Sequence, residues 1–196
     1  MQDDGARVVL LVEGESDRAA LATLAVRRGL DLPALRIRVE VMHGATNVNR
    51  HVAALAGTGV ALGGLYDAAE QHFVRRALER HGLRPEGSAG SLEEQGFFAC
   101  VVDLEDEMIR ALGVDRVLAV IAAEGELGSL ELLQNQPAQR GRTLDAQLRR
   151  FLTSKGGRKG RYGHLFAAAV PLDRVPAPLD GVLAWAQRQV RGAPRG

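Results

Sequence analysis

Short apolar runs recur through the first 113 residues, and each precedes a segment with apolar residues at helical spacing. Residues 8–12 are five consecutive apolar, mostly β-branched residues, which is typical of a strand buried on both faces. Further strands are expected at residues 36–41, 60–67 and 97–102. Helices are expected at residues 18–28, 48–57 and 69–81, and a further helix after the last strand is expected to end at residue 112. This alternation predicts an α/β fold, a parallel sheet with helices on both faces.

Strand patterns end after residue 113. Apolar spacing predicts helices around residues 117–121, 127–133, 144–152, 165–170 and 179–190. We therefore divide the chain into an α/β core at residues 1–113, a C-terminal helical region packed on that core at 114–191, and a frayed tail at 192–196. Residues 82–96 are rich in Gly, Ser, Pro and Glu and are expected to form an exposed loop.

Acidic residues follow three of the predicted strands. Glu13 comes directly after residues 8–12, Asp67 ends residues 60–67, and the acidic segment 103–107 follows the last strand. Carboxyl ends of parallel strands share one edge of a sheet, so these acids are expected to converge. Clustered carboxylates repel one another unless a cation neutralises them, and hard divalent cations prefer oxygen ligands. The sequence therefore predicts a metal site at this edge.

Local sequence also allows a simpler explanation of these acids, except for Glu13 at the end of its buried strand. Gly14 permits a tight turn, Ser16 is a good helix N-cap, and Asp17 would complement the dipole of the helix that begins there. Asp67 could likewise cap the next helix, and Asp106 and Glu107 fit an acidic first turn better than a metal site. The coincidence of all three strand ends favours the metal site.

Composition is that of a soluble globular protein, with 46% hydrophobic and 25% charged residues and a net charge of +1. The single cysteine, Cys100, lies in an apolar run and allows no disulfide within the chain, as in a reducing cytoplasm. The polar amino terminus resembles no signal peptide, and no apolar run approaches the ~20 residues that span a bilayer. A cytoplasmic location without membrane contact is expected.

Basic residues concentrate in residues 140–161, which hold eight Lys or Arg against one acid. Only two of the 25 basic residues are lysines, Lys155 and Lys159, and both lie in a glycine-rich stretch expected to be a loop. Few aromatic residues accompany them, which favours phosphate contact over base stacking. A solvated surface explains Arg140 and Arg142 better, whereas the remaining arginines and Lys155 are the candidates for nucleic-acid binding: Arg149, Arg150, Lys155, Arg158 and Arg161.

Five segments in order resemble the TOPRIM half of the OLD (overcoming lysogenization defect) family of nucleases. They are VEGESD (12–17), LYDAAE (65–70), DLEDEMIRALG (103–113), QPA (136–138) and RFLTSKGGRKGRYG (150–163). The resemblance implies a TOPRIM fold and an endonuclease that hydrolyses DNA, or RNA, with two Mg²⁺ or Mn²⁺ ions. It implies metal ligation by Glu13, Asp17, Asp67 and Glu105, and catalytic roles for Glu13 and for Lys159, which would stabilise phosphate charge.

The chain departs from the family pattern at two points. Ala69 stands where members usually carry a second acid, so Glu70 is the candidate replacement. No GxxxxGK[ST] motif occurs, so the chain is expected to act alone, as a homodimer, or with a separate ATPase subunit. A non-catalytic subunit that binds nucleic acid or an ATPase stays open as the alternative. Another phosphoryl-transfer activity also stays open, although no well-placed tyrosine supports a topoisomerase.

Overall fold

Four parallel strands form the centre of the computed structural model, which describes residues 5–84 and 90–192. They are β1 (Val8–Val12), β2 (Ile37–Val41), β3 (Ala61–Asp67) and β4 (Phe97–Cys100), in the order β2-β1-β3-β4. Val8 pairs with Ile37 on one side and with Ala61 on the other, so β1 is an interior strand. All five of its residues are buried, as the continuous apolar run predicts.

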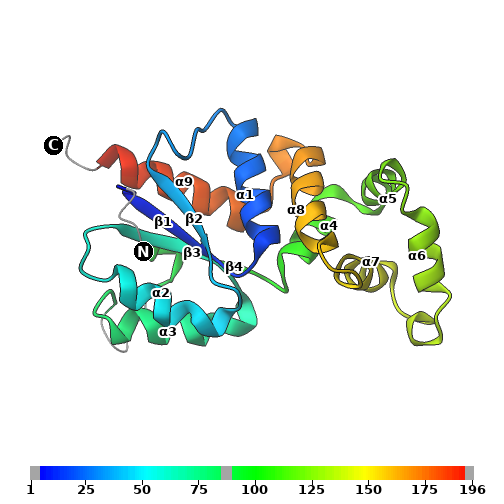
Figure 1. Cartoon of the computed structure of the whole chain (residues 1–196), viewed down its shortest axis with the longest axis horizontal. Coiled ribbons are helices and arrows are strands. Elements are labelled where there is room, and N and C mark those ends of the chain that lie inside the picture. Colours follow the sequence, from blue (N-terminus) through cyan, green and yellow to red (C-terminus); the bar gives the residue numbers. More distant parts are fainter. Residues whose placement is uncertain (1–4, 85–89, 193–196) are drawn as a thin grey trace.

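Helices cover both faces of this sheet (Figure 1). Val8, Leu10 and Val12 belong to the hydrophobic core shared with α1 (Glu15–Arg27) and α9 (Ala177–Gly192). Val9 and Leu11 belong to a second core shared with α2 (Val48–Leu55) and α3 (Gln71–Arg80). Alternate residues of a strand point to opposite faces, so one apolar strand anchors both layers. The predicted α/β class and the parallel sheet are confirmed.

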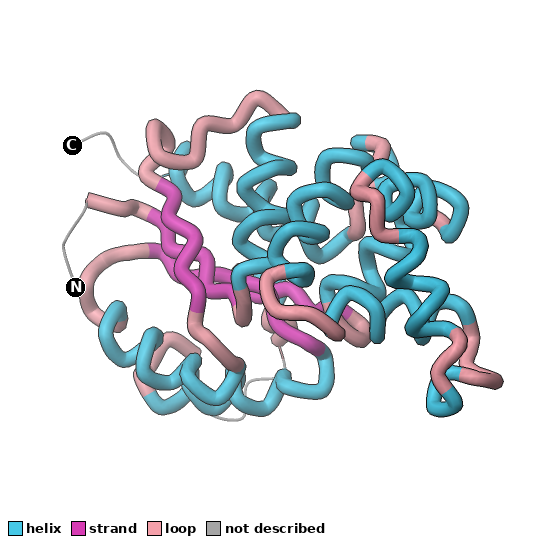
Figure 2. Tube along the Cα trace, turned by 45° about the vertical axis from the view of Figure 1, so that its right-hand side comes forward, coloured by secondary structure: helices cyan, strands magenta, loops and turns pink. Residues whose placement is uncertain are grey.

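The remaining helices extend beyond one end of the sheet (Figures 1 and 2). They are α4 (Leu104–Leu112), α5 (Val114–Ala123), α6 (Leu127–Gln134), α7 (Leu144–Thr153) and α8 (Arg158–Ala169). The last helix, α9, returns to the sheet and contacts β1, β3 and β4. The predicted region 114–191 thus contains helices of two kinds, those beside the sheet and one that covers it. No helix within residues 5–84 and 90–192 combines the length and hydrophobicity needed to cross a membrane.

Several local predictions need correction. Helix α1 begins at Glu15, and its N-cap is Gly14 rather than Ser16. The Gly14 N–H donates to Asp17 Oδ2 at 2.8 Å, so the acid caps the helix end from within its first turn. Lys159 lies in the first turn of α8 instead of a loop. In the expected loop 82–96, Glu93–Gln95 form a 3₁₀ turn, while residues 85–89 and the tail 193–196 lie outside the described residues.

The helices α1 and α8 pack unusually closely, because glycine occupies their contact. A Cβ added to Gly163 would lie 2.6 Å from the Ser16 carbonyl oxygen, closer than real Cβ contacts. A Cβ at Gly160 would meet the Glu15 Cβ at an ordinary 3.7 Å. Gly163 therefore sets how close α8 lies to the start of α1, and Gly160 does not.

We expect Gly163→Ala to destabilise the protein by about 1–3 kcal/mol, the usual cost of overpacking. For a chain of this length that lowers the melting temperature by roughly 2–12 °C. Gly160→Ala is the matched control and should keep or raise the melting temperature, because alanine is about 1 kcal/mol better than glycine inside a helix. Thermal melts followed by circular dichroism test the pair. Equal melting temperatures for the two variants would contradict this packing.

Candidate metal centre

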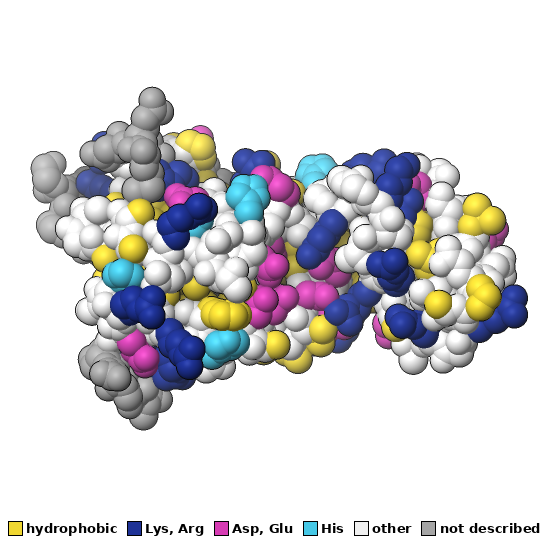
Figure 3. All heavy atoms as spheres, turned by 60° about the horizontal axis from the view of Figure 1, so that its bottom comes forward, with side chains coloured by type: hydrophobic (Ala, Val, Ile, Leu, Met, Phe, Trp, Pro, Cys, Tyr) yellow, Lys and Arg dark blue, Asp and Glu magenta, His cyan; other side chains and the backbone are white. Residues whose placement is uncertain are grey.

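Three carboxylates meet at the carboxyl edge of the sheet. Glu13, Asp67 and Glu70 each offer a ligand oxygen, and these oxygens lie within 4.8 Å of one another. Glu13 follows β1, Asp67 ends β3, and Glu70 ends the 3₁₀ turn Ala68–Glu70. In the space-filling view, Asp and Glu side chains gather in the middle of the visible face, with Lys and Arg beside them (Figure 3).

Strand register brings these acids together. Leu11 of β1 pairs with Gly64 of β3, so the two strands end side by side. A Cβ on Gly64 would lie 2.1 Å from the Leu11 carbonyl oxygen, so only glycine permits this approach. Side chains three residues apart lie on the same side of a 3₁₀ turn, which carries Glu70 to Asp67. Ala69, between them, is exposed.

The cluster carries uncompensated negative charge. Burial, together with the nearby Glu13 and Glu70 carboxylates, raises the pKa of Asp67 to about 7. Burial and Glu13 also raise the pKa of Glu70. The Oε2 atom of Glu70 is buried and has no hydrogen-bond partner among the described residues. A buried acceptor in this state is costly, so the site is suited to a cation.

A second acidic pair, Asp17 and Glu105, lies beside this cluster. Asp17 is 9% exposed, and burial and the charge of Glu105 raise its pKa to about 6 although the Gly14 N–H bond opposes the shift. Glu105 is 5% exposed, and burial raises its pKa as well. Its Oε2 atom is 3.2 Å from Lys159 Nζ, whereas Oε1 is buried and has neither a hydrogen bond nor an ion pair with any residue that the structure describes.

Lys159 forms an ion pair with Glu105 of this pair. Its side chain is 46% exposed, so one side of the ammonium group can reach a ligand. Burial acts to lower the pKa of Lys159, but the carboxylates of Glu105, Asp17 and Glu13 together outweigh it and the pKa is raised. Lys159 therefore keeps its positive charge at neutral pH. The structure thus brings all six predicted metal and catalytic residues to one edge: Glu13, Asp17, Asp67, Glu70, Glu105 and Lys159.

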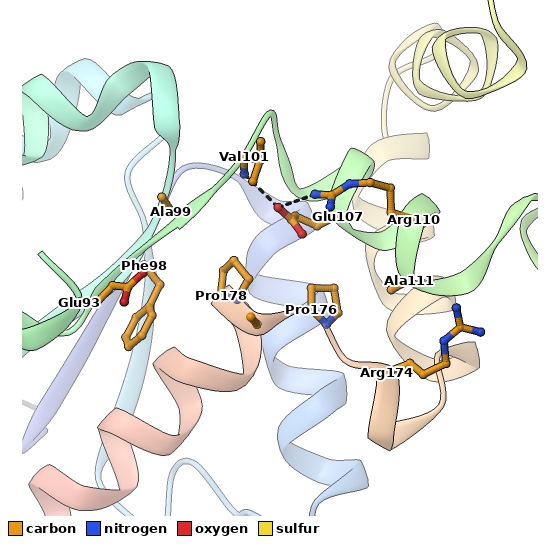
Figure 4. A pocket seen from close by; sticks show the side chains of 11 residues that line it. Glu93, Phe98, Ala99, Val101, Glu107, Arg110, Ala111, Arg174, Pro176 and Pro178 are labelled. Carbon is orange, nitrogen blue, oxygen red and sulfur yellow. Dashed lines mark hydrogen bonds and ion pairs between the residues drawn. The ribbon is translucent and has the colours of Figure 1, made fainter. Parts of the chain in front are cut away.

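Other acids of the 103–107 segment have structural partners. Asp103 caps α4 by accepting the Asp106 N–H at 2.8 Å. Glu107 accepts the Val101 N–H at 2.9 Å and pairs with Arg110 at 2.8 Å. These contacts of Glu107 border a hollow of about 580 Å³ beside β4 (Figure 4). Glu105 is therefore the member of this segment that joins the candidate centre.

The predicted nucleic-acid contacts divide into three groups. Arg150 and Lys155 are exposed and make no ion pair with any described residue. Arg149 pairs with Asp103 at 2.5 Å, and Arg161 pairs with Glu126 at 2.6 Å. Arg158 is the correction, because its side chain is only 7% exposed and is not available to a phosphate.

Arg158 is instead part of a buried connection between helices. Its guanidinium group donates to the Phe151 carbonyl oxygen and to Glu126, and stacks 3.9 Å from the Phe151 ring centroid. Tyr162 donates to Glu126 Oε2 at 2.9 Å. Sequence reasoning missed Glu126, because a lone acid before a helix carries no signal of its distant partners.

The donor set fits a hard divalent cation. All three clustered side chains offer carboxylate oxygens, the ligands that Mg²⁺ and Mn²⁺ prefer. Three buried carboxylate oxygens, Oε2 of Glu70 and both oxygens of Glu105, form no hydrogen bond with the residues that the structure describes, although Glu105 Oε2 forms an ion pair with Lys159. A cation at this edge would satisfy both the charge and these atoms.

Strands β1 to β3, the turn from Glu13 to Gly14, and Asp67 lie in the part of the chain that matches a known family model. Residues 6–68 match the family model of the overcoming lysogenization defect protein-like TOPRIM domain. The chain therefore contains an OLD-like TOPRIM domain. Comparison with curated proteins gave no match.

Solved structures extend the likeness to nearly the whole chain. The C-terminal region of the Xanthomonas campestris pv. campestris OLD protein superposes with a TM-score of 0.74 at 22% identity, covering 95% of each chain. The C-terminal region of the Burkholderia pseudomallei OLD protein gives 0.71 at 22% identity, covering 94% of this chain and 98% of that one. The fold, including its helical part, is therefore that of OLD protein C-terminal regions.

Asp67→Asn should stabilise the metal-free protein at pH 8. The raised pKa means that ionised Asp67 destabilises the folded state, a penalty that grows from about pH 4 to about pH 7 and stays constant above. We expect a melting temperature in EDTA about 2–4 °C above wild type at pH 8, the effect of ~1 kcal/mol, and none at pH 4.

Addition of Mn²⁺ should reverse this order, because a ligand that binds only the folded protein stabilises it and Asp67→Asn removes a ligand atom. Exposed Asp173 provides the control variant, Asp173→Asn, which should melt like wild type in both buffers. The cluster would not be a metal site if Mn²⁺ stabilised wild type and Asp67→Asn equally.

Proposed function

We propose that this chain is a divalent-metal-dependent nuclease that hydrolyses phosphodiester bonds in DNA. The observation that carries the proposal is the cluster of Glu13, Asp67 and Glu70 oxygens within 4.8 Å, beside the Glu105–Lys159 pair. The OLD-like TOPRIM domain supports it, since in OLD proteins this domain is the nuclease module.

Each side chain has a defined task in this reaction. Glu13, Asp67 and Glu70 would hold Mg²⁺ or Mn²⁺ through their clustered oxygens, and Asp17 and Glu105 would complete a second position beside them. Two such ions supply an activated water and stabilise the leaving oxygen. Glu13 lies in the turn between β1 and α1, at the end of an interior strand, where its carboxylate would be available to an ion at either position.

Lys159 contributes positive charge that the acids do not neutralise completely. Its Nζ atom contacts Glu105 at 3.2 Å, and the exposed side of the group faces solvent, where a phosphate oxygen would accept a hydrogen bond. Charge placed in advance near a scissile phosphate stabilises the transition state more than the ground state. The α1–α8 contact at Gly163 holds this helix end in place.

Glu13→Gln tests the proposal. It keeps the size of the side chain but removes one negative charge, and we expect loss of Mn²⁺-dependent cleavage of plasmid DNA by at least about 10²-fold. Calorimetry should show weaker Mn²⁺ binding in the same variant. Glu15→Gln, on the exposed surface two residues away, is the matched control and should cleave like wild type. Equal Mn²⁺ binding and cleavage by wild type and Glu13→Gln would reject the site.

A non-catalytic subunit that binds nucleic acid or an ATPase is the second candidate, and Ala69 is the observation that favours it. The side chain at this position is exposed and offers no ligand. Wild type that binds DNA without cutting it, together with an Ala69→Asp variant that cuts, would favour this candidate. Cleavage by wild type favours Glu70 as the ligand that replaces the missing acid.

Lys159→Ala should lower kcat by about 10²–10³-fold, the usual effect of losing one preorganised electrostatic group. Lys159→Arg should restore only part of the rate, because a planar guanidinium group replaces a compact charge. Mn²⁺ affinity should stay near wild type. The exposed Lys155→Ala is the matched control and should leave kcat close to wild type. Parallel losses of DNA affinity and cleavage in Lys159→Ala would assign Lys159 to backbone binding instead.

A further inference from the structure

A pocket of about 240 Å³ lies where α7 faces the start of α4. Its lining comes from both helices and from the segment before α7: Asp103, Glu105, Arg142, Ala146, Arg149, Arg150 and Thr153. Glu105 also contacts Lys159 at 3.2 Å, so this pocket and the candidate metal centre share a side chain. A ligand in the pocket would therefore lie next to the metal centre.

The pocket carries more positive charge than its own acids neutralise. Three arginines line it against two acids, and Asp103 is engaged by Arg149 at 2.5 Å and by the Asp106 N–H. Arg142 and Arg150 are exposed and form no ion pair with the residues that the structure describes. The Nε atom of Arg149 is buried and has no hydrogen-bond partner within residues 5–84 and 90–192. These unused donors suit an anion.

The chemistry of the lining selects a phosphate group. Guanidinium groups bind phosphate oxygens through paired hydrogen bonds, and three of them surround this space. No aromatic side chain lines the pocket, so it offers no platform on which a base could stack. Contacts of this kind position a nucleic-acid backbone and do not read its sequence.

We infer that Arg142, Arg149 and Arg150 bind a backbone phosphate of DNA that flanks the phosphate held at the metal centre. This inference rests on the proposed nuclease function and extends it to the positioning of the strand. It gives Arg142 a role that its sequence context did not favour. Arg140 differs, because it is exposed but does not line the pocket.

The first experiment measures binding without cleavage. Anisotropy of a short, fluorescein-labelled single-stranded DNA is recorded in EDTA over a series of salt concentrations, for wild type, Arg142→Ala/Arg150→Ala and the control Arg140→Ala. Loss of two of the three arginines, and with them of one neutralised phosphate, should make the slope of log K against log salt shallower by about 0.7 and weaken binding roughly fivefold at low salt. Arg140→Ala should match wild type. Wild-type affinity and slope in the double variant, or an equal loss in Arg140→Ala, would overturn the inference.

The second experiment locates the phosphate. One linkage next to the cleaved linkage is replaced by a neutral methylphosphonate, and cleavage is measured in Mn²⁺. The replacement should raise KM for wild type and leave KM of the double variant unchanged, because that variant no longer uses the charge. Equal increases in KM for both proteins would overturn the inference.

The two experiments distinguish a wrong assignment of the phosphate pocket from a wrong assignment of nuclease activity. Wild type that cleaves DNA, with an unchanged KM and salt slope in the double variant, would reject the pocket and leave the nuclease standing. DNA binding that depends on Arg142 and Arg150 in a protein that never cleaves would support the phosphate pocket and reject the nuclease. Circular dichroism of each variant verifies that these surface substitutions preserve the fold.

Discussion

Repulsion among carboxylates at one sheet edge is the constraint on which the site depends. Parallel strands must end together, so β1 and β3 deliver Glu13 and Asp67 to the same place, and a 3₁₀ turn adds Glu70. Burial intensifies the repulsion and raises the pKa of Asp67 to about 7. The fold therefore carries an electrostatic penalty that a cation would remove.

Close helix packing supplies the opposite charge. Helix α8 approaches the start of α1 because position 163 is glycine, and its first turn then places Lys159 against Glu105. The buried Arg158 in the same turn connects α8 to Glu126 and to the Phe151 ring, which holds that helix end. Adjacent basic residues thus have different tasks, since Arg158 supports the helix and Lys159 faces the acids.

Acids and bases come from different parts of the chain. The strand ends, the turns and helix start that follow them, and the first turn of α4 contribute the carboxylates, whereas α7, the segment before it and α8 contribute the cations beside them. Helix α9 returns to the sheet, where the Trp185 ring packs so closely on Gly63 and Gly96 that a Cβ at either position would lie within 2.6 Å of it. Helices α4 to α8 thus lie in the chain between β4, which is a strand of the sheet, and α9, which packs on the sheet.

The sequence by itself determined the strands, the parallel α/β class and the identities of the acids, because strand burial and strand-terminal residues are local patterns. Its apolar runs predicted β1, β3 and β4 within two residues at each end. Tertiary structure alone decided that Gly14 caps α1, that Lys159 begins a helix, and that Arg158 is buried. It also decided that Glu70, three residues from Asp67, completes the cluster. The positions of Lys159 and Arg158 depend on contacts between residues distant in sequence, such as Ser16 with Gly163, which no local pattern encodes. The Gly14 cap and the position of Glu70 are made by residues three apart, whose backbone geometry the residue types alone do not fix.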